Sequence, residues 1–452
     1  MKNLRGLLLK RGVMALAMAA GGSAALLFGS TALAAVDIQV WTALNSHNQD
    51  EFERLVRDFN RSQSDVKVSV KAHDTEASLE QVLQAGKDLP NLVQLGEMSG
   101  LDEVADRPYI MPMHTLLARE KMDNVSWFLA SNSFVRNGRG QLQGFPYMAE
   151  IPVMYYNINA FDKAKVEPAV PSRVWLDLQG QLVQLANNGS RRCPLTSDQS
   201  VSINLENLAA VNNQIYGLAP GPKVKGKVGF DFDVMYIRHL SMMISWVKSE
   251  LMVKPGTLPE SPQRFAKGEC AVMFSNSGHI GEYSDTRGLK YAVTGLPYYP
   301  EVTQTPGKPF VTGSALWAVK GHNAEQNQAS ARFISWLAQP ENAARWYQKT
   351  GFLPVSREAF NATGNDYYKD KGDWMHLVGA YSSGTSGTAK GNFRNYRQIR
   401  AVFNQSLESA LDGQLFAENG TEDKLIPVAS IFFLKGVKPV GKSASSKGSC
   451  CC

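Results

Sequence analysis

The chain has 452 residues, of which 44% are hydrophobic and 19% are charged, with a formal net charge of +6 at pH 7. The first 34 residues hold four of the 47 basic residues and no acidic one, so 43 basic residues face 41 acidic ones in the remainder. This near balance of charge excludes nucleic acid as an implied partner. The remaining residues, about 418, are enough for two lobes with separate cores.

Residues 1–34 have the pattern of a secretory signal peptide. A basic start precedes the apolar run Val13–Phe28, and Ala32–Ala34 forms a small-residue cleavage site. The apolar run is shorter than the roughly 20 residues that span a bilayer, although an uncleaved anchor is the alternative. No cysteine follows the run directly, so we expect a soluble periplasmic protein without a lipid anchor.

After this segment, apolar residues alternate between strand and helix periodicity. Ser46 and Gln49 form a capping box, and apolar side chains at helical spacing follow over residues 52–59. The expected elements are a strand through Ile38 and Val40, a helix from Ser46, a strand over 66–70, a helix over 79–83 and a strand over Leu92–Leu95. This alternation predicts an α/β lobe.

The stretch Gly144–Lys163 is the most informative part of the chain. Its pattern predicts a proline-punctuated loop, the apolar strand Val153–Tyr156 and a helix that starts after Asn157. Glu150 and several aromatic residues gather at the entrance of the strand, where α/β proteins tend to bind ligands.

The second half repeats the same alternation. Ser275–Gly278 is expected to be a small polar turn, and Pro340 and Gly351 mark the start and the stop of a helix. Further expected elements are a helix over Trp175–Leu185, strands over 271–274, 291–296 and 315–319, a helix ending at Leu337 and a helix over Gln398–Leu411.

These elements predict two α/β lobes with the chain passing between them more than once. The expected division is a first lobe over 35–150 with a return segment at about 310–355, a second lobe over 151–309 with 356–425, and an atypical tail over 426–452. The last part of this tail has a disordered composition.

Two cysteines, Cys193 and Cys270, lie in the body of the chain, and Cys450–Cys452 end it. A disulfide between the first two would stabilise the fold by ~4 kcal/mol in the chain-entropy model, and two buried thiols are the alternative. The terminal triplet lacks the spacing of zinc ligands, so we interpret it as an exposed tail and expect no metal.

Motifs of enzymes are missing from the sequence. The seven histidines form no H-E-x-x-H pattern, and there is no G-x-S-x-G elbow, P-loop or G-x-G-x-x-G after a strand. Paired carboxylates of a secreted hydrolase leave no fixed spacing in a sequence, so this class stays as an alternative. We expect no enzyme and no cofactor.

Arg400 and Glu97 are candidates for ligand binding. A guanidinium grips phosphate or carboxylate with two hydrogen bonds, and a surface salt bridge is the alternative for Arg400. Glu97 follows an apolar strand and could accept bonds from ligand hydroxyls, or act as an acid at a helix N-terminus. Aromatic residues that could stack on a sugar or glycerol, or belong to the core, are Trp41, Tyr147, Trp317 and Phe352.

Several segments together resemble the extracellular solute-binding proteins of ABC importers, in the carbohydrate-uptake group. They are Pro152–Asn157, Gly268–Ala271, Gly313–Trp317, Pro340–Ala344, Gln348–Pro354 and Gln398–Arg400. The resemblance extends to about residue 411. It implies a two-lobed fold with hinge crossovers and an interlobe ligand cleft, and a monomer that delivers its ligand to a permease in the inner membrane. The implied ligand is sn-glycerol-3-phosphate or a related glycerophosphodiester, and a neutral sugar is the alternative.

The resemblance also implies roles for single residues. Glu97 corresponds to a carboxylate that binds hydroxyls, Gly313 to a backbone donor and Arg400 to an arginine that grips phosphate. A family serine falls at Asn276, with Ser277 beside it. A family tyrosine is replaced by Phe352, and another falls near Thr75 or Glu76.

Glu150 departs from the family pattern, because a phosphate-binding serine would stand there. A carboxylate beside a phosphate dianion is repulsive unless it is protonated or turned away. One arginine against Glu97 and Glu150 leaves the pocket near −1, which disfavours a phosphate monoester and suits an amine-bearing diester or a neutral sugar. The alternative is that Glu150 faces solvent or pairs with a lysine.

Overall fold

The computed structural model describes residues 34–96, 101–120, 122, 125–129, 135–189, 192–218, 229–230, 232–255, 260–382 and 396–412. All of them except Ala34 belong to one unit that begins at Ala35. The predicted signal peptide up to residue 33, the candidate Glu97 and the tail after residue 412 with its cysteines lie outside the described residues. Among the described helices, none is long and apolar enough to cross a membrane.

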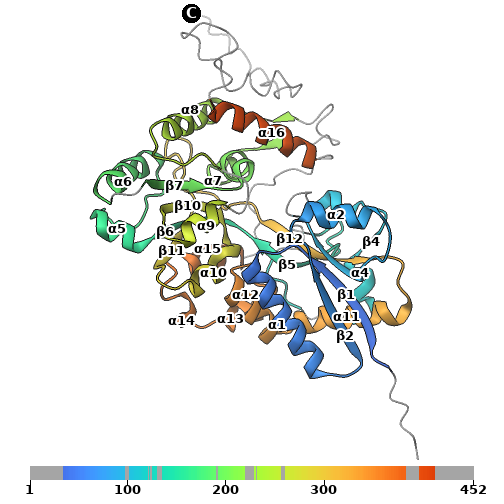
Figure 1. Cartoon of the computed structure of the whole chain (residues 1–452). Helices are drawn as coiled ribbons and strands as arrows, with labels where there is room; N and C mark the ends of the chain where they lie inside the picture. Colours follow the sequence, from blue (N-terminus) through green and yellow to red (C-terminus); the bar gives the residue numbers. More distant parts are fainter. Residues whose placement is uncertain are drawn as a thin grey trace, which may run out of the picture. The chain divides into compact units, whose positions relative to one another are not determined.

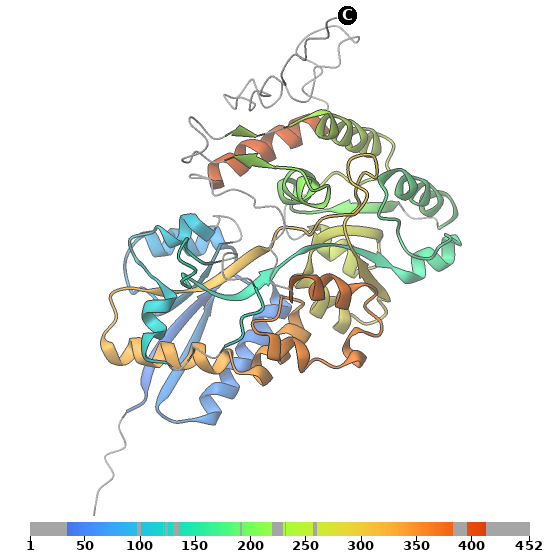
Figure 2. The ribbon, with the colours of Figure 1, turned by 180° about the vertical axis from the view of Figure 1, so that it is seen from behind.

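The first sheet has the strand order β2-β1-β3-β12-β4, and β5 pairs with β12 (Figure 1). β1 is parallel to β2 and β3, whereas β12 is antiparallel to β3, β4 and β5. Its strands are β1 (Val36–Thr42), β2 (Val66–Ala72), β3 (Leu92–Leu95), β4 (Ile110–Met111), β5 (Phe145–Glu150) and β12 (Thr312–Val319). In Figure 2 the orange β12, from late in the sequence, runs among the blue strands of the beginning.

Helix α1 shows how the sequence builds this part of the fold. Its apolar residues within 52–59 are buried in the core of the first sheet, as their spacing predicts. The capping box predicted at Ser46 is wrong, because Asn45 is the N-cap and its side chain accepts a hydrogen bond from Asn48 N at 2.9 Å. The helical elements of this part are α1 (Ser46–Ser62), α2 (Glu76–Gln84), α3 (Leu101–Ala105), α4 (Met113–Leu116), η1 (Leu117–Arg119), α11 (Ala324–Leu337), α12 (Pro340–Thr350) and α13 (Arg357–Asn361).

The second sheet has the strand order β11-β6-β10-β7. β6 is antiparallel to β10 and β11, and β7 is parallel to β10. A disulfide joins Cys193 of β7 to Cys270 of β10, which are partners in the strand register, so the alternative of two buried thiols is wrong. The strands are β6 (Pro152–Asn157), β7 (Cys193–Ser197), β10 (Cys270–Asn276) and β11 (Tyr291–Thr294), with a separate pair β8 (Gly217–Leu218) and β9 (Gly229–Phe230).

The remaining helical elements come from the second half of the chain and from the segments between the strands of the second sheet. They are α5 (Ile158–Ala164), α6 (Trp175–Asn188), η2 (Ser202–Glu206), α7 (Asn207–Val211), α8 (Val234–Lys248), α9 (Glu260–Ala266), η3 (Ser277–His279), α10 (Ile280–Asp285), α14 (Asn365–Tyr368), α15 (Trp374–Ser382) and α16 (Tyr396–Leu411). The predicted boundaries of α12 are confirmed, since Pro340 is its first residue and Gly351 ends it with a φ of 85°.

Two expected loops are strands or helical turns in the structure. The segment before Ile151 was expected to be a loop, but it forms β5; Pro146 is compatible with a strand there because, among the described strands, β5 pairs with β12 alone. The polar turn expected at Ser275–Gly278 is also wrong in part: its first two residues end β10 and Ser277 begins the short helix η3.

The chain passes from the first sheet to the second between Glu150 and Pro152, and it is back in the first sheet at Thr312. Thr312 is the register partner of Glu150, so the two crossings lie side by side. The assignment of whole segments to two lobes stays a prediction.

Candidate functional site

The side chain of Glu150 lies at this crossing and is 7% exposed. Its Oε1 accepts a hydrogen bond from Asn276 Nδ2 at 3.0 Å, and its Oε2 accepts one from Gly278 N, also at 3.0 Å. The alternative that Glu150 faces solvent is therefore wrong. Two N–H donors, one on each oxygen, match the acceptor geometry of an ionised carboxylate.

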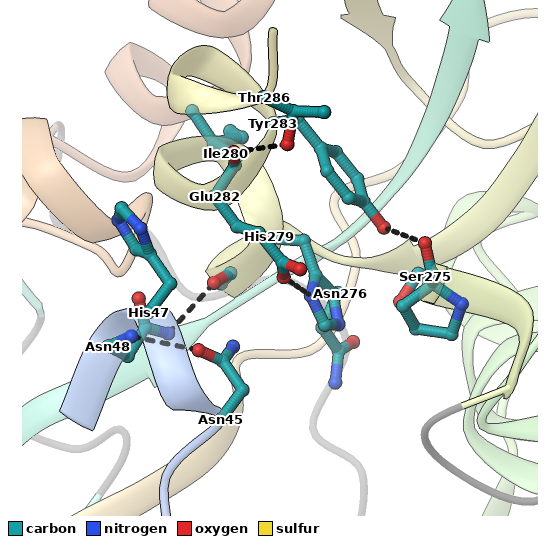
Figure 3. A network of polar contacts seen from close by, with 12 residues as sticks. Asn45, His47, Asn48, Ser275, Asn276, His279, Ile280, Glu282, Tyr283 and Thr286 are labelled. Carbon is teal, nitrogen blue, oxygen red and sulfur yellow. Dashed lines mark hydrogen bonds and ion pairs between the residues drawn. The ribbon is translucent and has the colours of Figure 1, made fainter. Parts of the chain in front are cut away.

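The turn after β10 is fixed to neighbouring segments on several sides. Ser277 N donates to Ile151 O at 2.8 Å, and Ser277 Oγ accepts from Ile151 N at 3.3 Å. From α1, Asn48 Nδ2 donates to Gly278 O at 2.9 Å (Figure 3). Both ends of the Gly278 residue are thus held, its N–H by Glu150 and its carbonyl by Asn48.

Two glycines and one aromatic ring complete this surrounding of Glu150. A Cβ on Gly278 would lie 2.6 Å from Glu150 Oε2 and 3.0 Å from a ring carbon of Phe352. Gly313 has a φ of 89°, and a Cβ there would lie 2.3 Å from the carbonyl oxygen of Met148. The structure therefore brings together five of the predicted site residues: Glu150, Asn276, Ser277, Gly313 and Phe352.

His279 adds a titrating group next to this set. Burial lowers its pKa, but its hydrogen bond to Glu282 and the negative charges of Asp198, Glu282 and Glu150 outweigh burial and raise the pKa above the ordinary value. The bond joins His279 Nδ1 and Glu282 Oε2 at 3.2 Å (Figure 3). The site thus contains a titratable group that the charge count from the sequence left out.

Arg400 belongs to a different set of contacts. It lies on α16, where its Nε is 3.7 Å from Glu206 Oε1, and both side chains are largely buried. The pair is not the surface salt bridge that was the alternative for this residue. An acid of the chain itself already offsets part of the charge that a phosphate would need from Arg400.

Another buried acid lies against the residue that follows β3. Glu76, the first residue of α2, accepts a hydrogen bond from Gly96 N at 3.0 Å. Thr75 is the N-cap of the same helix, with its side chain bonded to Ser78 N. The role predicted for Glu97 stays a prediction, because that residue lies outside the described part.

The other aromatic candidates are core residues. Trp41, Tyr147 and Trp317 are at most 2% exposed, and Tyr147 stacks on Trp346 with ring centroids 4.9 Å apart. Phe352 is also buried, but its ring edge meets the turn at Gly278.

One group of side chains has atoms close enough to hold a metal ion. Within the described residues, ligand atoms of His47, Glu51 and Asp285 lie within 4.8 Å of one another. Two of the three have protein partners: His47 Nε2 is 2.8 Å from Lys349 O, and Glu51 accepts from Arg54 at 2.7 Å. These contacts account for the positions of both side chains without an ion.

Sequence reasoning missed three residues of this site: Asn48, Gly278 and His279. Gly278 and His279 directly follow Ser277, and this adjacency is the signal in the sequence that marks them. Asn48 lies 230 positions away from Gly278, and no local pattern marks it as a partner.

The comparisons with known proteins agree with this architecture. The model of the family described as bacterial extracellular solute-binding protein matches residues 54–373 of this chain. The sn-glycerol-3-phosphate-binding periplasmic protein UgpB of Rhizobium meliloti (strain 1021) is 27% identical over 410 residues, which cover 87% of this chain and 93% of the relative. UgpB of Salmonella typhimurium is 27% identical over 416 residues, which cover 88% and 92% of the two chains.

Solved structures show the same fold at lower identity. UgpB from Mycobacterium tuberculosis in complex with glycerophosphocholine has a TM-score of 0.67 at 16% identity, with 88% of this chain and 96% of that chain covered. Maltose-bound T. maritima MalE3 has a TM-score of 0.69 at 16% identity, with 88% and 100% covered. The predicted α/β fold of this class is confirmed. The family match extends over more than half of the chain. The chain therefore belongs to the family of bacterial extracellular solute-binding proteins.

Proposed function

We propose that this protein is a periplasmic substrate-binding component of an ABC importer that captures a glycerophosphodiester or sn-glycerol-3-phosphate. It acts as a monomer, catalyses no reaction and delivers its ligand to a permease of the inner membrane. The family to which the chain belongs supports this proposal. Two relatives that are similar over most of the chain support it as well, because their names say that they bind sn-glycerol-3-phosphate.

The observation that carries the proposal is the polar set around Glu150, where the chain crosses between the two sheets. Groups from both sides meet there: Gly313 lies on a strand of the first sheet, and Asn276 ends a strand of the second. A ligand that contacts both groups favours the conformation in which they are close, and this differential affinity shifts the equilibrium between open and closed forms.

Of the two ligands, the diester fits the charges better. A glycerophosphodiester carries one negative charge on its phosphate, whereas a monoester carries about 1.5 to 2 at pH 7. The carboxylates of Glu150 and Glu206 both disfavour the larger charge. A neutral sugar is the second candidate, because Phe352 lacks a hydroxyl that could serve a phosphate and Glu150 suits hydroxyl donors.

The test is a thermal-shift screen of the protein from Ala35 onward. The ligands are glycerophosphocholine, glycerophosphoethanolamine, sn-glycerol-3-phosphate and a panel of neutral sugars. A ligand at a hundredfold excess over its Kd stabilises the folded state by about 2.7 kcal/mol, so a true ligand raises the melting temperature by several degrees. We expect the largest shift with a diester; a shift with sugars alone would support the second candidate, and turnover of any ligand would contradict both.

A further inference from the structure

We propose that the carboxylate of Glu150 occupies the anion-binding position of this site, so that the site rejects phosphate monoesters. The neutral or cationic part of the solute is then the part that faces Glu150. This inference rests on the function proposed above and specifies which end of the ligand meets which part of the chain.

The first step of the argument is the direction of the donors. Asn276 Nδ2 and Gly278 N each lie 3.0 Å from a different oxygen of Glu150. A bound phosphate or carboxylate would require the same arrangement, in which two N–H groups meet the oxygens of one anion. Here the anion is a side chain of the protein itself, brought in at the end of β5.

The second step is the space around the carboxylate. Glu150 Cγ would be 2.9 Å from a Cβ on Gly313, and Glu150 Oε2 would be 2.6 Å from a Cβ on Gly278. Both distances are shorter than a Cβ tolerates, so the side chain of Glu150 fills the room that two glycines leave open. A phosphate group therefore has neither the donors nor the space at this point unless Glu150 is removed.

The third step is the charge of the surroundings. Three carboxylates, those of Asp198, Glu150 and Glu282, act on the His279 ring. Arg400, in turn, is 3.7 Å from the carboxylate of Glu206. Acids of the chain thus lie close to both His279 and Arg400, and a dianion meets repulsion from these acids that a neutral or cationic group does not.

The experiment compares the wild type with Glu150→Ser and Glu150→Gln, using inorganic phosphate, sn-glycerol-3-phosphate and glycerophosphocholine as probes in calorimetric titrations. Serine vacates the space of the carboxylate and leaves both donors in place. Glutamine keeps the shape, can still accept from Gly278 and removes the charge. Glu301→Gln is the control, because it makes the same change of net charge at an exposed acid that pairs with Arg238.

We expect the affinity of Glu150→Ser for inorganic phosphate and for sn-glycerol-3-phosphate to rise at least tenfold over the wild type. The gain should be smaller for Glu150→Gln and absent for Glu301→Gln. If the serine variant does not fold, a gain of threefold or more in the glutamine variant supports the proposal and no gain overturns it.

Unchanged affinity for inorganic phosphate in a folded Glu150→Ser protein overturns the inference, as does a wild type that binds phosphate as tightly as this variant. Failure of the proposed function looks different. In that case the wild type binds none of the glycerol phosphates, while the gain of phosphate binding in Glu150→Ser still reports the position of the anion.

Discussion

His239 is a residue at which burial alone sets the charge. It is fully buried beside Trp175, and its ring nitrogens lie within hydrogen-bonding distance of Tyr299 Oη and Asn204 Oδ1. Burial lowers its pKa to about 3. The folded protein therefore holds this histidine neutral at pH values where the unfolded chain takes up a proton.

From this we predict a loss of stability in acid that depends on His239. Because the folded pKa is below the unfolded value, the contribution is fully present above about pH 6.5 and is lost as the pH falls toward 3. Between pH 6.5 and 4 the free energy of unfolding should fall by ~3 kcal/mol from this group, at about 1.4 kcal/mol per pH unit. Urea denaturation of the wild type and His239→Gln at several pH values measures the difference, and parallel pH profiles of the two proteins would contradict it.

His279 should show the opposite dependence. Burial opposes its protonation, but the bond to Glu282 and the charges of Asp198, Glu282 and Glu150 raise its pKa in the folded state. Its stabilising contribution is then fully present below about pH 6.5 and is lost as the pH rises through the raised pKa. We expect His279→Gln to lower the free energy of unfolding more at pH 5.5 than at pH 8.5, as measured by urea denaturation; an equal loss at both values would show that the residue acts through packing alone.

At the scale of elements, the end of α12 is tied to the turn that carries the site. Gly351 has a φ of 85°, and a Cβ there would lie 2.3 Å from the carbonyl oxygen of Ser277 and 2.6 Å from Ile280 Cβ. The glycine is needed both for its left-handed backbone and for the close approach of α12 to η3 and α10.

We therefore predict that Gly351→Ala lowers the free energy of unfolding by about 2–4 kcal/mol, through strain of the backbone and overpacking. Gly288→Ala is the matched control, since Gly288 has the same φ of 85° and nothing within 4 Å of its would-be Cβ. The control should cost only about 1–2 kcal/mol. Equal melting temperatures of the two variants would show that the contact with Ser277 carries no energy.

Some elements of the fold could be predicted from the sequence alone, and others could not. The spacing of residues 52–59 and the pair Pro340 and Gly351 predicted two helices, because apolar periodicity and helix stops are local signals. β5 was expected to be a loop because Pro146 is unfavourable in a strand, and only the pairing with β12 shows that the position is an edge. Pairing across 160 residues leaves no local trace.

The site, too, could be predicted from the sequence only in part. Four other predicted residues lie around Glu150, because the resemblance to a family carries the positions of distant residues together. The orientation of Glu150 could not be predicted from the sequence, since it depends on Gly278 N and Asn276, which lie about 126 positions away. The pairing of Arg400 could not be predicted either, because Glu206 comes close to it only in the folded chain.

At the scale of the whole molecule, one ion-pair network joins the parts of the chain around the two sheets. Glu80 of α2 is buried and accepts from Arg107 at 2.7 Å and from Arg397 of α16 at 2.5 Å. Helix α16 packs into the core of the second sheet through Phe403 and Leu407. The pair between Glu80 and Arg397 therefore connects α2 to the other part of the protein.

We predict that Arg397→Ala lowers the free energy of unfolding by about 0.5–1 kcal/mol, because Arg397 is partly exposed and such pairs are weak. If the ligand favours the conformation in which this pair forms, ligand affinity should fall by about two- to fivefold. Arg238→Ala is the control, because its partner Glu301 lies in the same part of the chain. An affinity that is unchanged in Arg397→Ala, measured by titration calorimetry, would separate the pair from ligand binding.

The insertion of β12 has a consequence for how the protein is made. Residues 312–319 hydrogen-bond with β3, β4 and β5, which leave synthesis some 160 to 220 positions earlier. Until these residues have been translated, the three earlier strands lack their shared partner, and the first sheet stays incomplete. Contacts over such separations also slow folding. A nascent chain that ends before Thr312 should therefore remain sensitive to protease, which leaves a long interval for export before the protein becomes compact.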